Sequence, residues 1–362
     1  MKKNYISALA VLACVAVFCT ISGNSFHQMR IATEEIIPGE GVTEVRMLSD
    51  YFPDLAGTAG DTQIYVLQGE QEGGSCLILG GTHANELGGH MGAVLFVENA
   101  KVEAGTLYVI PRTNNSAFTH NDPQEGHPST VHITTDEGNV REFIHGSRAT
   151  NPVDQWPDPD VYVNYMGQSL SGSENRNINR TYPGKADGTL TEMMSYGIVQ
   201  LINTENIDVT VDLHEASPEY PVINALIAHE RAMNLASNVV VDMQMEGVQI
   251  SLEPSPTDLR GLTHRELGDH TDTLALLMEA PNPAQGRLRD RTDEALVLTG
   301  KSETYVKAGE IGQLYVPYDE NGWPIEVRCA RHVFGIERIL ANYSEMYEEP
   351  IIVTGMPRDR KS

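Results

Sequence analysis

The sequence predicts an α/β fold in which helices cover both faces of a central sheet. Short apolar runs alternate with longer amphipathic runs between residues 60 and 285, as is typical of that architecture. The chain has 362 residues and is 40% hydrophobic, enough for one large domain or two ordinary ones. After about residue 285 the pattern changes to short strand-like runs, so we expect a small β-rich C-terminal appendage.

The expected elements follow one another in a regular order. The predicted strands are 63–67, 76–79, 106–110, 208–213, 222–228 and 273–278, with turn residues at 71–74. The predicted helices are 86–99, 189–203, 231–245 and 332–347, the second of which begins at a Thr189–Glu192 capping box. Short strands are expected in the appendage at 295–299, 303–307 and 313–317.

Residues 113–176 are rich in Pro, Gly, Asp, Asn and His, and they predict an irregular stretch with one hairpin near 136–139. Long irregular segments inside a domain are often functional. The resulting division is a leader at 1–24, a main domain at 40–285 and a C-terminal region at 286–362 that ends in a helix.

The N-terminus has the pattern of an export signal. Lys2 and Lys3 precede an apolar run at 6–21, and small residues follow at 22–24. The run is close to spanning length, so a retained membrane anchor is the alternative. In either case we expect an exported protein that is periplasmic, secreted or anchored facing outward, with membrane contact only through this segment.

Composition excludes some classes of partner and site. The chain has 50 acidic and 25 basic residues, and a formal charge of -25 argues against binding of nucleic acid. Outside the leader only Cys76 and Cys329 remain, and neither belongs to a CxxC pair, which excludes a cysteine zinc site. We expect Cys76 to be a buried thiol in a strand.

Metal-ligating side chains follow two of the predicted strands. His83 and Glu86 come after the strand-glycine sequence LILGG, and His214 ends the β-branched run VTVDLH. Imidazole nitrogens and a carboxylate oxygen are normal zinc ligands, and catalytic sites use three protein ligands. Asp212 is placed to orient His214, whereas Glu215 should point away from the metal because successive strand residues face opposite sides.

Two further segments carry polar groups suited to hydrolysis. Glu279 ends the apolar run LALLMEA, where a partly buried carboxylate beside a metal suits a general base. The segment NRNINRTYPG contains Asn179 and Arg180, and Arg with Asn is a common carboxylate-binding pair. Each motif alone occurs often by chance.

Together and in this order, the four motifs resemble the zinc carboxypeptidase superfamily, and most closely its succinylglutamate desuccinylase/aspartoacylase branch. The resemblance covers about residues 60 to 285. It implies a mixed, mostly parallel central sheet flanked by helices. It also implies one zinc ion held by His83, Glu86 and His214.

The resemblance further implies that Glu279 is the catalytic carboxylate and that Asn179 and Arg180 hold the free carboxylate of the substrate. The family also uses an upstream arginine to polarise the scissile carbonyl. Arg176 is the first choice for that role, with Arg112 and Arg148 as rivals.

The chain departs from ordinary zinc carboxypeptidases in its tyrosines. Those enzymes place a substrate-facing tyrosine about twenty residues before the catalytic Glu, but no tyrosine lies between Tyr220 and Tyr305 here. The aspartoacylase branch resembles a design in which a C-terminal domain supplies it, and the candidates are then Tyr305, Tyr315 and Tyr318. The segment 260–266, with two arginines and a histidine, is expected either to line the pocket or to form surface ion pairs.

The implied function is a zinc-dependent hydrolase that cleaves an amide bond in an N-acyl amino acid or a similar carboxylate-bearing substrate. The main alternative is an extracytoplasmic zinc carboxypeptidase that acts on short or cell-wall peptides. A serine hydrolase is disfavoured because the sequence has no GxSxG elbow. A non-catalytic binding protein of the same fold is disfavoured because Glu279 and the arginines are present, and other divalent ions remain compatible with the ligand set.

Overall fold

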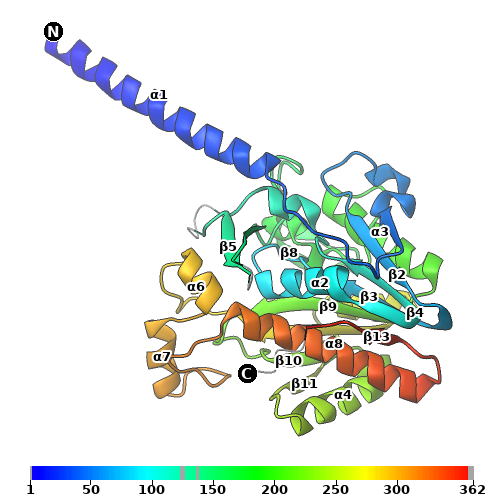
Figure 1. Ribbon diagram of the computed structural model, residues 1–362. Helices are drawn as coiled ribbons and strands as arrows, with labels where there is room; N and C mark the ends of the chain where they lie inside the picture. The colour runs from blue at the N-terminus through cyan, green and yellow to red at the C-terminus, as the bar shows by residue number, and fades with distance from the viewer. Residues whose placement is uncertain (1, 123–126, 136–137, 358–362) are drawn as a thin grey trace.

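The computed structural model describes residues 2–122, 127–135 and 138–357. Within this part of the chain, nine strands form one sheet in the order β1–β2–β4–β3–β9–β12–β10–β11, with β13 paired to β4 (Figure 1). These strands are β1 (Glu44–Met47), β2 (Gln63–Gln68), β3 (Gln71–Leu79), β4 (Lys101–Ile110), β9 (Val209–Ala216), β10 (Ala225–Ala228), β11 (Ser251–Pro254), β12 (Leu274–Pro281) and β13 (Ile352–Thr354).

The sheet is mixed and has a parallel centre. Strands β4, β3, β9 and β12 run parallel to their neighbours in this group. Antiparallel pairings lie outside them, between β1 and β2, β2 and β4, β12 and β10, and β13 and β4. The predicted mixed, mostly parallel central sheet is therefore confirmed, and the carboxyl ends of β3, β9 and β12 meet at one edge.

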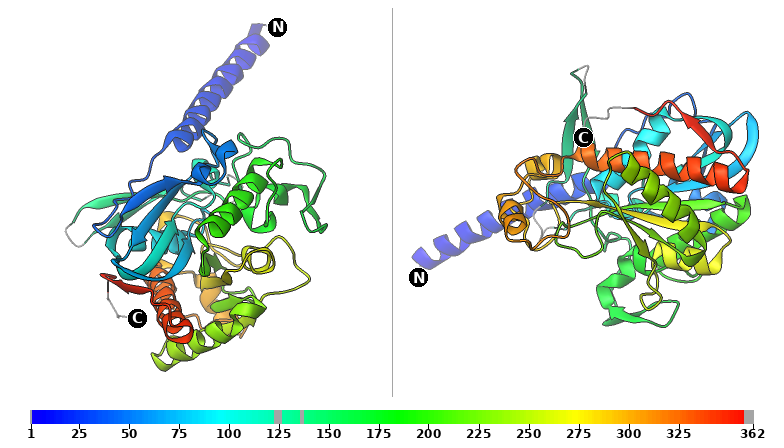
Figure 2. Two further views of the ribbon diagram at one scale, coloured as in Figure 1. Left: turned by 90° about the vertical axis from the view of Figure 1, so that its right-hand side faces the viewer. Right: turned by 90° about the horizontal axis from the view of Figure 1, so that it is seen from below.

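Helices cover both faces of this sheet (Figure 2). On one face, α2 (Leu87–Asn99), α4 (Met233–Met245) and α8 (Ile325–Tyr347) pack against one apolar cluster. On the other face, α3 (Leu190–Glu205) and α5 (Thr263–His270) pack against a second cluster. Strand β3 contributes to both, because Cys76 and Ile78 join the first cluster and Leu77 and Leu79 join the second.

Two expectations about local structure are wrong. Residues 71–74, expected as a turn, belong to β3, and the turn lies before them, at residues 69–70. The C-terminal region is helical rather than β-rich, with α6 (Glu294–Thr299) and α7 (Glu303–Glu310) where strands were expected. Apolar runs of five residues do not distinguish a strand from a helical turn. The N-caps decide the outcome here, because Asp293 accepts from the Leu296 amide and Ser302 from the Tyr305 amide.

The residues after 285 also contribute to the central layers. Helix α8 packs against α2 and α4, and β13 pairs with β4 of the sheet. Residues 113–176 are mostly irregular, as expected, and they include the short hairpins β5 (Thr130–Thr134) with β6 (Val140–Ile144) and β7 (Val161–Val163) with β8 (Ser169–Ser171). The expected hairpin turn at 136–139 falls between β5 and β6, and its residues 136 and 137 lie outside the described residues.

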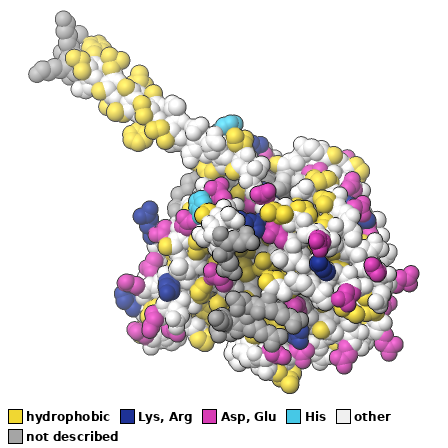
Figure 3. All heavy atoms as spheres, viewed as in Figure 1, with side chains coloured by type: hydrophobic (Ala, Val, Ile, Leu, Met, Phe, Trp, Pro, Cys, Tyr) yellow, Lys and Arg dark blue, Asp and Glu magenta, His cyan; other side chains and the backbone are white. Residues whose placement is uncertain are grey.

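The N-terminal helix α1 (Lys2–Ile31) projects from the rest of the molecule, and Figure 3 shows hydrophobic side chains along it. Residues Tyr5–Ile31 are long and apolar enough to cross a membrane, and their most apolar 18-residue stretch is not buried against the rest of the described chain. A signal sequence passes the same test. The chain that follows α1 is tied into the fold, because the buried Glu34 carboxylate pairs with His90 of α2 and accepts a hydrogen bond from the Ile144 amide.

A buried ion pair joins α8 to the sheet behind the strand ends. The guanidinium of Arg328 and the carboxylate of Glu215 are both fully buried, and their closest atoms lie 2.9 Å apart. The same carboxylate accepts from the Gly88 amide and from Asn282 Nδ2, both at 3.0 Å. Glu215 therefore faces away from His214, in agreement with the expectation from strand alternation.

Loss of one partner of this pair should be strongly destabilising. We expect Arg328→Met to lower the free energy of unfolding by about 3–5 kcal/mol, because Glu215 would remain buried without a counter-charge. Urea unfolding of the full-length protein, followed by circular dichroism, measures this loss. Arg338→Met on the same helix is the control, since Arg338 only lies over the Phe334 ring and should lose less than about 1 kcal/mol. Equal losses in the two variants would contradict the assignment.

Candidate metal centre

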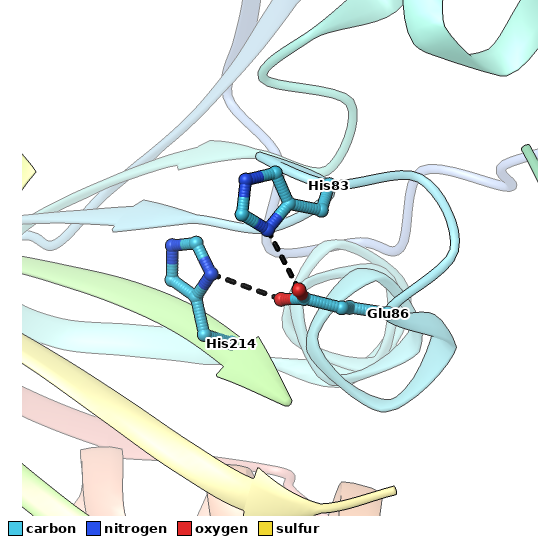
Figure 4. Close-up of side chains that lie close together, drawn as sticks. All are labelled: His83, Glu86 and His214. Carbon is cyan, nitrogen blue, oxygen red and sulfur yellow. Dashed lines mark hydrogen bonds and ion pairs between the residues drawn. The ribbon is translucent and has the colours of Figure 1, made fainter. Parts of the chain in front are cut away.

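Three donor side chains converge at the carboxyl edge of the sheet (Figure 4). The Nδ1 atom of His83 lies 2.6 Å from Glu86 Oε1, and the Nδ1 atom of His214 lies 2.9 Å from Glu86 Oε2. One donor atom from each residue lies within 4.8 Å of the others, and all three side chains are buried. The predicted ligands, far apart in the chain, thus form one group with the spacing and donor types that can hold a metal ion.

The loop that carries His83 is shaped by a glycine. Gly81 has a φ of +61°, and a Cβ atom at this position would lie 2.5 Å from the carbonyl oxygen of Pro111. Only glycine fits both the left-handed conformation and this close approach. Backbone hydrogen bonds from Ala84 to Ser147 and from Gly146 to Ala84 then hold the loop against the segment that follows β6. The position of His83 is therefore fixed from both sides.

Each histidine is oriented by an acceptor on its other nitrogen. His214 Nε2 lies 2.8 Å from Asp212 Oδ2, the contact expected from the sequence, and Asp212 Oδ1 accepts from Thr82 Oγ1 at 2.6 Å. His83 Nε2 lies 2.9 Å from Asn177 Oδ1, which sequence analysis missed. These acceptors hold both rings with Nδ1 turned toward Glu86, so Nδ1 would be the ligating atom if a metal ion were bound there.

The electrostatics of the cluster suit a cation. Burial would raise the pKa of Glu86, but the neighbouring His83 and His214 outweigh burial and hold that pKa well below its usual range. Burial would lower the pKa of His214, but the charges of Asp212 and Glu86 outweigh it and raise that pKa. Two ionised carboxylates thus flank one imidazole in a buried site. A divalent cation would offset this negative charge, so the residues present fit a metal.

Glu279 stands beside the cluster on the neighbouring strand. In the β9–β12 register it lies directly opposite His214. Its side chain is partly exposed, but Oε2 is buried and has no hydrogen-bond partner among the described residues. Burial, with the nearby charges of Glu86 and Asp212, raises the pKa of Glu279 to about 8, against the opposing effect of His214 and Arg148. A raised carboxyl pKa near a candidate metal centre marks a group suited to proton transfer.

The raised pKa makes a prediction about metal-free protein. A carboxyl group whose folded pKa lies above its unfolded value stabilises the fold at low pH and loses that contribution as the pH rises through the folded pKa. The stability of wild-type protein in EDTA should therefore fall between about pH 4.5 and about pH 8 in part because of Glu279. Glu279→Gln should unfold at a higher temperature than wild type at pH 8 and at the same temperature at pH 4.5. The same difference in melting temperature between wild type and Glu279→Gln at both pH values would contradict the raised pKa of Glu279.

Asn179 and Arg180 lie on a short 3-10 helix, η5 (Ile178–Arg180), next to α5. Asn179 Oδ1 accepts from the amide and hydroxyl of Thr263 at 2.8 and 3.0 Å, and Asn179 Nδ2 has no partner among the described residues. Burial and the charge of Arg148 lower the pKa of Arg180, while Glu279 acts in the opposite direction. Arg180, Arg148 and Glu279 therefore share one electrostatic neighbourhood.

The three arginines considered for carbonyl polarisation have different surroundings. Arg176, the first choice, donates to both oxygens of Asp158 at 2.7 and 2.9 Å and to the carbonyl oxygen of Thr150, so its guanidinium is engaged away from the histidines. Arg112 lies over the Phe118 ring. Arg148 is exposed and forms no hydrogen bond or ion pair with a described residue. Its charge acts on the pKa of His83 as well as on Glu279 and Arg180.

Two of the three C-terminal tyrosines donate their hydroxyl hydrogens to nearby backbone carbonyls. Tyr305 donates to the Gln285 carbonyl at 2.7 Å, and Tyr318 donates to the Gly300 carbonyl at 2.5 Å. Tyr315 is exposed. Tyr220, in the segment after β9, is also exposed.

The segment 260–266 divides into two parts. Arg260 pairs with Glu266 at 2.7 Å, and Arg265 pairs with Asp269 at 2.7 Å, so both arginines form ion pairs, although Arg265 and Glu266 are themselves buried. His264 is buried, and its Nδ1 lies 2.8 Å from Ser255 Oγ. Its pKa is lowered to about 3 by burial. The expected ion pairs are therefore present, but they lie partly in the interior rather than on the surface.

Comparison with known proteins gives structural neighbours only. No family model matches the chain, and no curated protein matches it. Among solved structures, a succinylglutamate desuccinylase from Silicibacter sp. is 15% identical, with a TM-score of 0.43 over 78% of this chain and 61% of its own. A succinylglutamate desuccinylase/aspartoacylase from Rhodobacter sphaeroides is 14% identical, with a TM-score of 0.42 over 83% of this chain and 62% of its own.

A metallo-carboxypeptidase from Burkholderia cenocepacia is 12% identical, with a TM-score of 0.46 over 84% of this chain and 66% of its own. The chain thus spans about three fifths of the length of the first two structures. With TM-scores below 0.5, these likenesses carry no argument about activity or substrate. The three neighbours bear the names of the branch and superfamily that the sequence resembles.

Proposed function

We propose that this protein is a zinc-dependent hydrolase that cleaves the amide bond of an N-acyl amino acid or a similar carboxylate-bearing substrate. The observation that carries the proposal is the buried group of His83, Glu86 and His214, whose donor atoms lie within 4.8 Å of one another, with Glu279 opposite His214 on the next strand. Residues of three of the four candidate motifs thus lie together, which supports the proposal.

The metal-binding residues are His83 and His214 through Nδ1 and Glu86 through its carboxylate. A zinc ion bound there supplies Lewis-acid chemistry and lowers the pKa of water. Asn177 and Asp212 hold the two imidazole rings in the ligating orientation.

The substrate's free carboxylate binds Arg180 and Asn179, whose amide nitrogen has no partner among the described residues; Arg180 now lies 3.7 Å from Glu174, a contact that the substrate would replace. Glu279 takes the proton of the attacking water as the new carbon–oxygen bond forms. It then delivers that proton to the nitrogen as the carbon–nitrogen bond breaks. The guanidinium of Arg148, in place of that of Arg176, stabilises the negative charge that develops on the carbonyl oxygen.

The N-terminal helix supports a location outside the cytoplasm. Its apolar stretch at Tyr5–Ile31 is compatible with a signal sequence or an anchor. We propose that the domain is exported. If the helix is retained, it would hold the domain at a membrane surface, and the pairing of Glu34 with His90 ties the chain that follows the helix to the domain.

The catalytic and metal-binding roles can be separated by two substitutions. Glu279→Gln should lower kcat by at least about 100-fold, because the proton acceptor is lost, while one equivalent of zinc remains bound. His214→Ala should lose both zinc and activity. Metal analysis with a panel of N-acyl amino acids and short peptides measures both, and activity on peptides alone would favour the carboxypeptidase. Near-normal turnover by Glu279→Gln would overturn the proposal.

The arginine assignment has its own test. Arg148→Ala should lower kcat by about 100- to 1,000-fold with little change in the melting temperature, because an exposed side chain without a partner contributes little to folding. Arg176→Ala is the matched variant. It should mainly lower stability, because it leaves Asp158 without its bidentate partner, and should change kcat only a few-fold. The reverse pattern would return the role to Arg176.

A further inference from the structure

We propose that a cavity between the segment after β9 and helix α7 binds an apolar acyl group of the substrate; this inference rests on the proposed function. The cavity has a volume of about 780 Å³, within the range of small-molecule sites. Apolar side chains contribute to its lining from three separate parts of the chain, namely Tyr220, Leu288, Ala308 and Ile311.

The cavity opens at the edge of the sheet where the metal ligands lie. Ser217, which lines it, follows β9 and stands three residues after His214, a span of about 10 Å along an extended strand. Gly286 lines it from the segment that follows β12 and Glu279. The Asn282 amide donates to the Ala216 carbonyl at 2.7 Å, so the two segments leave the sheet side by side.

Tyr220 is the aromatic part of the lining. It is 48% exposed and stands six residues after His214, on the segment that leaves the sheet at the end of β9. Its ring is therefore available to pack against an apolar acyl chain.

The region around Asn179 and Arg180, where we place the amino-acid portion of the substrate, is closed by packing. The cavity is therefore assigned to the acyl group. Asn179, Thr263 and His264 are all buried, and the Thr263 amide and hydroxyl bind Asn179 directly. A Cβ atom on Gly261 would lie 2.1 Å from the Arg180 carbonyl oxygen, so this loop is packed against η5. A bulky group must therefore leave the site past the ends of β9 and β12.

The charges at the cavity fit a substrate that carries a carboxylate. Arg287 and Lys307 line it and are exposed, whereas Glu219 is the acid among its lining residues, and its Oε1 accepts from the Arg287 amide. The whole chain has twice as many acidic as basic residues, 50 against 25. This locally cationic rim would attract an anionic substrate toward an otherwise repulsive surface.

The test measures binding of octanamide, a neutral amide with an apolar chain, to the full-length, zinc-loaded protein by calorimetry. Ala308→Trp fills the cavity, and Ile311→Glu places a charge in its lining at a side chain that is 73% exposed and contributes little to folding. Both variants should weaken octanamide binding at least 10-fold. Glu310→Trp, on the same helix but outside the lining, is the matched control and should bind as wild type does.

Kinetics give a second measurement. The ratio of kcat/KM for N-octanoyl-L-alanine to that for N-acetyl-L-alanine should fall at least 10-fold in Ala308→Trp and Ile311→Glu and stay unchanged in Glu310→Trp. Failure of wild type to bind octanamide, or equal binding by all variants, would overturn the subsite. Absence of hydrolysis across a broad substrate panel, with octanamide binding intact, would instead overturn the hydrolase proposal, and the acyl assignment with it.

Discussion

The site depends on one buried carboxylate. Glu86 contacts His83 through Oε1 and His214 through Oε2, and Oε2 also accepts a hydrogen bond from the Glu215 amide at 3.0 Å. This single side chain therefore ties together the loop after β3, the start of α2 and strand β9. An unpaired carboxylate in this position would be costly, so the geometry of the two histidines follows from the need to satisfy it.

The candidate metal centre and the loop that carries Asn179 and Arg180 share a scaffold of hydrogen bonds. Asn177 accepts from His83 and from the Asn179 amide, so the residue that orients a metal ligand also shapes the turn that presents Arg180. On the other side, Thr263 binds Asn179, and its hydroxyl acts on the pKa of Asp212. A displacement of either group would therefore move the other, so the positions of His83 and of the Asn179–Arg180 turn are coupled.

The C-terminal helices act on the same edge of the sheet from two directions. Arg328 of α8 neutralises Glu215 directly behind the Glu86 contact, and α7 forms one wall of the cavity beyond β9. The region expected to be a small β-rich appendage therefore packs against the central layers of the fold. Its short helices α6 and α7 begin at the N-cap residues Asp293 and Ser302. Both caps can be recognised in the sequence, but the short apolar runs that follow them are equally typical of strands.

The sequence alone predicted six of the nine strands of the central sheet and the grouping of the four residues His83, Glu86, His214 and Glu279. Each follows a short apolar run, and parallel strands bring their carboxyl ends to one edge, so order along the chain is enough to group them. Only the tertiary structure found Asn177 as a partner of His83 and the different surroundings of Arg148 and Arg176. These depend on the path of the long irregular segment, where no periodicity relates position in the chain to position in space.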